Sequence, residues 1–191
     1  MTGRTLIVYS TKSGINEEAA VEMANVLKTT SSNKDVTVAD LREGQPDIAP
    51  FQNIIVGGGV RERMVYREAM DFLARDFSGK NVAIYFSCED SEIPKMETVE
   101  EDAKKVLMKN PSLKPVAVSG FGGCMFLDGR PALDEKSLAR VRDWASELGR
   151  KFDAQMEAMP QMAMAATTGG TTTTSTDTTT DQSKEMMDKE K

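Results

Sequence analysis

The sequence predicts an α/β fold of three layers (α/β/α), in which helices cover both faces of a five-stranded parallel sheet. Short runs that are mainly apolar recur along the chain, as expected for strands that are buried on both faces. Segments with apolar residues at helical spacing separate these runs, so strand and helix alternate. Right-handed crossovers would connect the strands, and we expect the strand order 2-1-3-4-5, one of two common solutions.

The expected strands are short and most of them are apolar at nearly every position. Their bounds are 6–9, 36–39, 53–57, 82–86 and 115–119. The second run interleaves threonine with valine and alanine, which indicates an edge strand. The first, third and fourth runs lack this alternation and are therefore expected in the middle of the sheet.

Four segments between and after the strands have the spacing of helices with one buried face. Their bounds are 17–28, 66–76, 97–108 and 134–152. Pro111 and Pro115 bracket the turn after the third helix. Asp134 is the expected N-cap of the fourth, which would bury Trp144 and end near Phe152.

The character of the chain changes after the last expected helix. Residues 155–166 are rich in methionine and alanine, and residues 167–180 are almost entirely threonine and glycine. The threonine-rich tract has too few apolar side chains to offset the entropy of ordering. We therefore expect one folded domain over residues 1–154 and a disordered Met/Thr-rich C-terminal tail over residues 155–191.

The composition excludes several classes of function. Twenty-four basic and 30 acidic residues give a formal net charge of -6, whereas nucleic-acid binding needs a cationic surface, so no nucleic-acid partner is expected. The absence of histidine excludes His-based catalysis and His-ligated metals. Cys88 and Cys124 form no CxxC pair, so no metal site is expected. Few cysteines and no long apolar run predict a soluble cytoplasmic protein without stable membrane insertion.

The loop after the first strand carries the clearest functional signal. Strand, polar turn and helix in this order place free backbone N–H groups and the positive end of the helix dipole at the carboxyl edge of the sheet. The arrangement predicts a site for a phosphate monoester, to which the Asn16 amide could donate a hydrogen bond. An ordinary turn in which Ser13 or Asn16 caps the helix is the alternative. The candidate residues are Ser10, Thr11, Lys12, Ser13, Gly14, Ile15 and Asn16.

The same segment resembles the flavodoxin signature, in which two apolar residues and an aromatic precede a Ser/Thr, a small residue and an alanine. The matching residues are Ile7, Val8, Tyr9, Thr11, Gly14 and Ala20. Asn16 replaces the usual threonine of that signature, and Met23 replaces an aliphatic residue. The resemblance extends over residues 4–152 and implies a flavodoxin-like fold with FMN as its cofactor.

Two other segments are similar to a narrower branch of flavodoxin domains, which includes the bacterial protoporphyrinogen dehydrogenase. They are the segment from Val56 to Leu73, with its glycine-rich turn and Phe-Leu helix end, and the turn of residues 120–123. Members of that branch that dehydrogenate a porphyrin carry extra loop sequence. The loop between the fifth strand and the last helix is expected to be short here.

Two further loops would flank the flavin ring. Three consecutive glycines at 57–59 indicate close approach to a flat ligand and positive φ angles. By resemblance, the backbone of Gly58 or Gly59 would bind flavin N5, and Arg61 could face the ring. The candidate residues of this loop are Gly58, Gly59, Val60 and Arg61.

The second flanking loop would run from Ser87 to Asp90, with Ser87, Cys88 and Glu89 as its candidate residues. Flavodoxins usually place an aromatic side chain in this loop, and this chain does not. The nearest candidates for stacking on the ring are Tyr66, Phe86 and Phe121.

The resemblance implies an FMN-binding protein that carries electrons between redox partner proteins, with no catalytic residue of its own. An FMN-dependent dehydrogenase of protoporphyrinogen or quinone type is one alternative, although these loops show no substrate pocket. A flavodoxin-shaped binding module without cofactor is the other, favoured by Asn16 and by the missing ring aromatic. The sequence makes no prediction about the oligomeric state.

Overall fold

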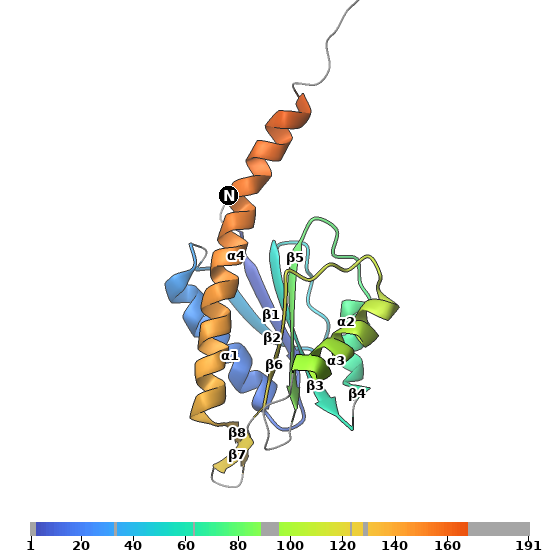
Figure 1. Cartoon of the computed structure of the whole chain (residues 1–191), viewed down its shortest axis with the longest axis vertical. Helices are drawn as coiled ribbons and strands as arrows, with labels where there is room; N and C mark the ends of the chain where they lie inside the picture. Colours follow the sequence, from blue (N-terminus) through green and yellow to red (C-terminus); the bar gives the residue numbers. More distant parts are fainter. Residues whose placement is uncertain are drawn as a thin grey trace, which may run out of the picture.

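The computed structural model describes residues 3–32, 34–62, 64–88, 96–122, 124–127 and 130–167. Its strands are β1 (Thr5–Ser10), β2 (Val36–Asp40), β3 (Asn53–Arg61), β4 (Met64–Val65), β5 (Asn81–Cys88), β6 (Ala117–Phe121), β7 (Cys124–Leu127) and β8 (Arg130–Leu133). Its helices are α1 (Ile15–Thr30), α2 (Arg67–Leu73), α3 (Met96–Lys109) and α4 (Glu135–Thr167). Figure 1 shows how these elements surround the sheet.

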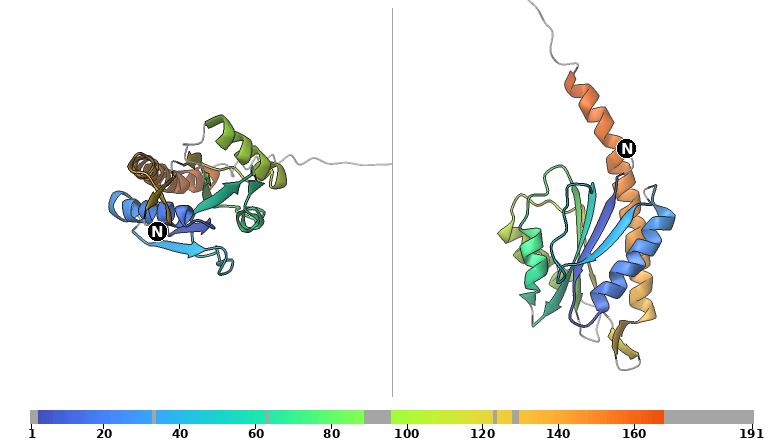
Figure 2. Two further views of the ribbon diagram at one scale, coloured as in Figure 1. Left: turned by 90° about the horizontal axis from the view of Figure 1, so that it is seen from below. Right: turned by 180° about the vertical axis from the view of Figure 1, so that it is seen from behind.

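Five parallel strands form the sheet in the order β2-β1-β3-β5-β6, and β4 pairs antiparallel with the end of β3. Because β4 is additional, β5 and β6 are the fourth and fifth parallel strands. The predicted order 2-1-3-4-5 and the α/β class are therefore confirmed. Helices α1 and α4 cover one face, and α2 and α3 cover the other (Figure 2).

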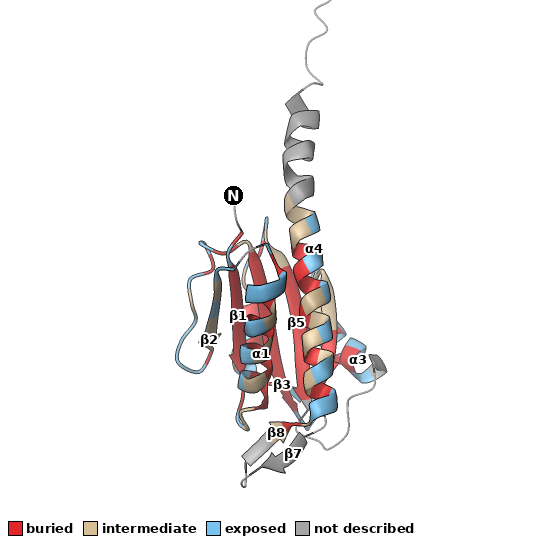
Figure 3. Ribbon diagram, turned by 90° about the vertical axis from the view of Figure 1, so that its left-hand side faces the viewer, coloured by how far each residue is buried: buried red, intermediate tan, exposed pale blue. Residues whose placement is uncertain are grey.

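Each face of the sheet has its own apolar core, and β1 contributes to both. Leu6 and Val8 pack towards α2 and α3, whereas Ile7 and Tyr9 pack towards α1 and α4. Leu6, Ile7 and Val8 have no exposed surface, and Figure 3 shows the same burial along β3 and β5. Burial on both faces explains why these strands lack the alternation of an exposed strand.

Several element bounds differ from those predicted. Helix α2 is shorter than 66–76, because the chain turns where Asp76 accepts hydrogen bonds from the backbone N–H and the hydroxyl of Ser78. The fifth parallel strand, β6, begins at Ala117 rather than at residue 115. Val116, just before it, donates its N–H to the Val82 carbonyl. The sequence correctly placed both elements but not their ends.

Helix α4 continues to Thr167, beyond the predicted end near Phe152 and beyond the expected domain boundary at residue 154. Methionine, alanine, glutamine and glutamate are strong helix formers, which favours this extension, and Pro160 is accommodated within it. A β-carbon on Gly3 would lie 2.6 Å from Met156 Sδ, so the start of the chain packs closely against α4. Residues 168–191 of the expected tail lie outside the described residues.

The segment between β6 and α4, predicted as a short loop, comprises residues 122–134. It contains an antiparallel hairpin of β7 and β8, at the carboxyl edge of the sheet (Figure 1). The Leu133 N–H donates to Glu18 Oε2 at 2.8 Å, which ties the hairpin to α1. Among the helices in the described part of the chain, none is long and apolar enough to span a bilayer.

Candidate functional site

The candidate site lies where β1 and β3 end beside each other. The chain leaves β1 for α1 on one face and leaves β3 for α2 on the other, so the connections diverge at this point. Ser10 is paired with Gly58, and Gly58 with Phe86, which brings three strand ends to one edge. In open α/β sheets, ligands bind at such switch points.

The loop of residues 10–16 turns into α1 through a left-handed residue. Gly14 has φ 93° and ψ -11° and is the N-cap of the helix. Its N–H donates to Thr11 Oγ1 at 2.9 Å, and its carbonyl accepts the Glu18 N–H at 3.0 Å. A residue with a β-carbon would be strained at this φ, which explains the glycine.

No side-chain hydrogen bond from the N-cap residue closes the start of α1. The alternative in which Ser13 or Asn16 caps the helix is therefore wrong, because Gly14 takes that position. The first three N–H groups of a helix have no acceptor within it. Together with the helix dipole they form an anion-binding position at the head of α1.

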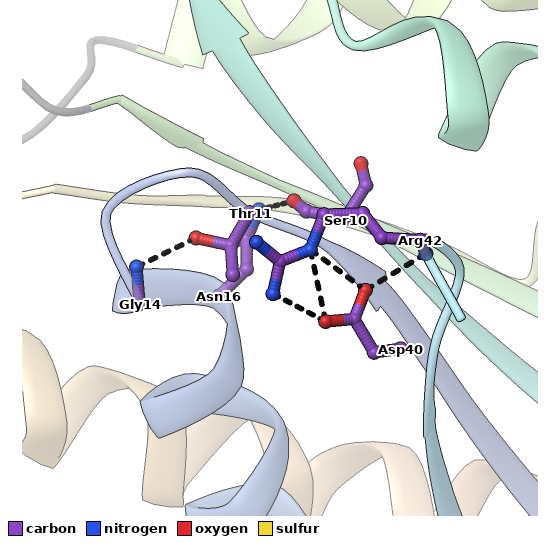
Figure 4. A network of polar contacts seen from close by, with 6 residues as sticks. All are labelled: Ser10, Thr11, Gly14, Asn16, Asp40 and Arg42. Carbon is purple, nitrogen blue, oxygen red and sulfur yellow. Dashed lines mark hydrogen bonds and ion pairs between the residues drawn. The ribbon is translucent and has the colours of Figure 1, made fainter.

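Asn16 is fully buried and holds the loop together (Figure 4). Its Nδ2 donates to the Ser10 carbonyl at 2.6 Å. This amide therefore makes a hydrogen bond within the loop, whereas the sequence predicted it as a donor to a ligand. Asn16 Oδ1 and Ser10 Oγ are both buried without a hydrogen-bond partner among the described residues. A buried polar atom without a partner costs about 1–3 kcal/mol, so both oxygens indicate that a ligand group completes this edge.

Lys12 and Tyr66 connect this loop to the start of α2. The Lys12 ammonium lies 5.2 Å from the centroid of the Tyr66 ring, within the range of a cation–π contact. Lys12 is exposed, and Tyr66 precedes α2 as its N-cap residue. The contact places this exposed cation between the loop after β1 and the start of α2.

The three glycines at 57–59 do not form the predicted turn. They lie in β3, and the positive φ angles among described glycines belong to Gly14, Gly44 and Gly79. A β-carbon on Gly57 would lie 2.2 Å from Tyr85 Cζ, and one on Gly59 would lie 2.3 Å from Tyr66 Cε2. These glycines therefore make room for aromatic rings of this chain.

The turn lies further along, in a hairpin of β3 and β4. Val60 pairs with Val65 and Arg61 with Met64, while Glu62 takes a positive φ of 52° in the turn. The Tyr66 N–H donates to the Gly59 carbonyl at 2.9 Å. The Gly59 carbonyl therefore has one partner within the chain and keeps a second lone pair, so the predicted contact with flavin N5 stays a prediction.

The remaining residues predicted beside the ring have different surroundings. The Arg61 side chain is 61% exposed, with Nε 3.9 Å from Glu62 Oε1. Ser87 and Cys88 belong to β5, paired with Gly59 and Val60, so the chain is still a strand where a loop was predicted. Glu89 lies outside the described residues.

The candidate stacking rings are not exposed to the same extent. Phe86 and Phe121 are each 1% exposed and belong to the two cores. Tyr66 is 9% exposed and is the candidate that contacts the loop after β1, through Lys12.

Comparison with known proteins identifies the family. The model of the flavodoxin domain family matches residues 6–143, which include the loop after β1 and all five parallel strands. The chain belongs to the flavodoxin domain family. No curated protein sequence matches it significantly.

Solved flavodoxins share the fold of this flavodoxin domain. Oxidised flavodoxin 1 of Bacillus cereus is 17% identical with a TM-score of 0.55, covering 75% of this chain and 95% of its own. The flavodoxin of Streptococcus pneumoniae TIGR4 is 20% identical with a TM-score of 0.55, covering 77% and 98%. A Fusobacterium nucleatum flavodoxin variant bound to flavin mononucleotide is 18% identical with a TM-score of 0.51, covering 78% and 97%.

The flavodoxin domain carries one ion pair at this edge that sequence reasoning missed. Arg42 Nε lies 2.9 Å from Asp40 Oδ2, and the Arg42 backbone N–H donates to Asp40 Oδ1 at 2.9 Å (Figure 4). The hydrogen bonds from Arg42 hold the pKa of Asp40 below its usual value. The signal was available, because both residues follow the predicted strand 36–39 at its carboxyl end.

This ion pair adjoins the base of the loop. Tyr9 is paired with Asp40 across the two strands, and its carbonyl accepts the Leu41 N–H at 2.8 Å. Burial, followed by the nearby carboxylates of Glu17 and Asp40, raises the pKa of Tyr9. The strand pairing of Tyr9 with Asp40 and the hydrogen bond from Leu41 hold the end of β2, with its ion pair, beside β1.

Proposed function

We propose that this flavodoxin domain binds FMN and carries electrons between redox partner proteins. The observation that carries the proposal is the loop after β1, in which the N-cap residue of α1, Gly14, makes no side-chain hydrogen bond to the helix. Ser10 Oγ and Asn16 Oδ1 are buried there without partners. A phosphate group attached to a polyol chain offers both the acceptors and the hydroxyl donors that such an edge needs.

The phosphate would be held by the loop of residues 10–16. The N–H groups of the first turn of α1 donate to an anion at the positive end of the helix dipole. Lys12 adds an exposed positive charge beside this position. FMN is thus matched by its phosphate rather than by its ring alone, and riboflavin, which lacks the phosphate, should bind more weakly.

The ring would lie between the ends of β3 and β5. Gly58, Gly59, Val60 and Arg61 are the candidates on one side, and Ser87, Cys88 and Glu89 on the other. Bound FMN would supply one- or two-electron redox chemistry. The acidic net charge of -6 favours encounter with positively charged partner proteins.

A second candidate is an FMN-dependent dehydrogenase of protoporphyrinogen or quinone type. The hairpin of β7 and β8 favours it, because this hairpin lies at the carboxyl edge of the sheet where a short loop was expected. Turnover of a dye-coupled quinone or porphyrinogen by the FMN-loaded protein would support the dehydrogenase, and its absence would leave the electron carrier.

Titration of the purified protein with FMN and with riboflavin, followed by visible absorbance, tests the proposal. We expect FMN to bind at least tenfold more tightly, and Lys12→Gln to weaken FMN binding several-fold without changing riboflavin binding. Lys28→Gln removes the same charge from the last turn of α1 and is the matched control. If FMN does not bind, the proposal is wrong and the cofactor-free module remains. Equal affinities for FMN and riboflavin would show that the loop after β1 does not bind the phosphate.

A further inference from the structure

We propose that Tyr85 is a positioning residue for the anion-binding loop, whose hydroxyl fixes the first turn of α1 through the Asn16 carbonyl. The inference rests on the proposed function and deepens it, since it names the group that orients the phosphate site. Tyr85 lies in β5 and is distant in sequence from the loop. Nothing in the local sequence of the loop indicates this contact.

The Tyr85 hydroxyl donates to the Asn16 carbonyl oxygen at 3.0 Å, and the Tyr85 side chain is fully buried. A carbonyl oxygen has two lone pairs, so it accepts the hydroxyl in addition to its helical partner. Asn16 in turn donates from Nδ2 to the Ser10 carbonyl. The two hydrogen bonds form a series from the centre of the sheet, through the first turn of α1, to the start of the loop.

Gly57 allows the Tyr85 ring to reach the loop. The two residues are register partners on adjacent strands, and a β-carbon on Gly57 would lie 2.2 Å from Tyr85 Cζ and 2.3 Å from its hydroxyl oxygen. Any side chain at residue 57 would therefore displace the ring from its path towards Asn16. Gly57, the first of the three glycines, thus allows a contact with the loop after β1, although it lies in β3.

Two aromatic rings hold Tyr85 from the other side. The Phe121 ring centroid lies 5.7 Å from that of Tyr85, and the Trp144 centroid lies 6.3 Å away in an edge-to-face arrangement. Such pairs prefer tilted geometries, so they favour one orientation of the Tyr85 ring. Burial raises the pKa of Tyr85, which keeps the hydroxyl protonated and able to donate.

A comparison of FMN with riboflavin in Tyr85→Phe protein separates positioning from general stability. Removal of the hydroxyl should weaken FMN binding by roughly tenfold and riboflavin binding much less, because riboflavin lacks the phosphate that the first turn of α1 would bind. Asn110→Ala is the control, since Asn110 is buried and bonds the Leu73 and Arg75 carbonyls at the opposite end of the sheet. It should lower stability without favouring either ligand. Equal losses for both ligands in Tyr85→Phe, or no loss, would overturn the inference.

Amide hydrogen exchange gives a second measurement that does not depend on FMN. The N–H groups of Glu18, Ala19 and Ala20 bond the carbonyls of the first turn, as shown for Glu18 and Gly14. In ligand-free Tyr85→Phe protein we expect these amides to exchange several-fold faster, while those in the last turn of α1 stay unchanged. Unchanged exchange in the first turn would overturn the positioning role. If the unsubstituted protein fails to bind FMN, only the proposed function is lost, and the exchange result still decides the role of Tyr85.

Discussion

The two chain segments that meet at the carboxyl edge are built in different ways. The loop after β1 is defined by nearby residues, because Thr11, Gly14 and Asn16 make hydrogen bonds within six positions of one another. Strand β3, by contrast, is fitted by aromatic rings that pack over its glycines, Tyr85 of β5 over Gly57 and Tyr66 over Gly59. Glycine is therefore required in the first segment because Gly14 has a positive φ, and in the second because a β-carbon would overlap an aromatic ring.

The two segments also differ in how many polar groups they leave open to a ligand. The loop after β1 leaves helix N–H groups and buried oxygens for a ligand to complete. In the hairpin, by contrast, the Gly59 carbonyl already has its partner in Tyr66. The loop after β1 therefore leaves more polar groups open to a ligand than the hairpin does.

The largest effect that tests this comparison is expected for Gly57→Ala. The new β-carbon overlaps the Tyr85 ring, and overpacking of this kind should lower the free energy of unfolding by about 3 kcal/mol. Chemical denaturation measures the loss. Tyr85→Leu in the same chain should recover part of it, because the shorter side chain leaves space at residue 57. A loss that Tyr85→Leu does not reduce would contradict the spatial role of this glycine.

A smaller effect is expected for Gly14→Ala, which has no atom within 4 Å of its β-carbon but has φ +93°. Left-handed backbone should cost about 1–2 kcal/mol of stability, with no distant substitution able to recover it. Gly14→Asn is the matched variant, since asparagine tolerates this region better, and it should cost less in the same denaturation measurement. Equal stability of all three proteins would show that the conformation of residue 14 is not constrained.

The ion pair beside the loop predicts a dependence of stability on pH. Because the pKa of Asp40 is lower in the folded protein than its unfolded value of about 3.9, its contribution is present above that value. The contribution is lost as the pH falls through the lower folded pKa. Asp40→Asn should therefore be less stable than the unsubstituted protein near neutral pH, by about 1 kcal/mol because Arg42 is half exposed.

Thermal unfolding of the two proteins across the acidic range measures this effect. The difference between them should decrease as the pH falls below about 3.9 and disappear once the pH is below the folded pKa of Asp40, where the carboxylate is protonated in both states. A difference that persists unchanged to the lowest pH would mean that the charge of Asp40 is not responsible.

The smallest effect is expected for Arg61→Gln at the exposed end of β3. Its side chain is 61% exposed and its contact with Glu62 is 3.9 Å long, so stability should change by less than about 0.5 kcal/mol. Glu62→Gln, which removes the other charge, should behave alike in the same denaturation measurement. A large loss in either variant would show that this hairpin is held by charge and not by its aromatic contacts.

The sequence predicted the sheet because its strands are apolar on both faces, and it predicted the loop after β1 because its residues act locally. It placed Gly58 and Gly59 in a turn, since consecutive glycines are typical of turns and the rings that pack on them come from elsewhere. Tyr85 was assigned only to a buried strand for the same reason. Asp40 and Arg42 were missed although they directly follow a predicted strand end. Apart from this local ion pair, the contacts that a single sequence did not reveal join segments that are distant in sequence.

The close packing of Gly3 against Met156 has a consequence for engineering. The first residues of the described chain and the middle of α4 lie side by side, so a short linker would suffice to join them. A circular permutant could then open at Gly79, an exposed left-handed turn before β5. Because that turn lies at the amino edge of the sheet, the new ends would be remote from the anion-binding loop. Such a chain would offer an attachment point for a fused protein at the edge of the sheet opposite the loop after β1.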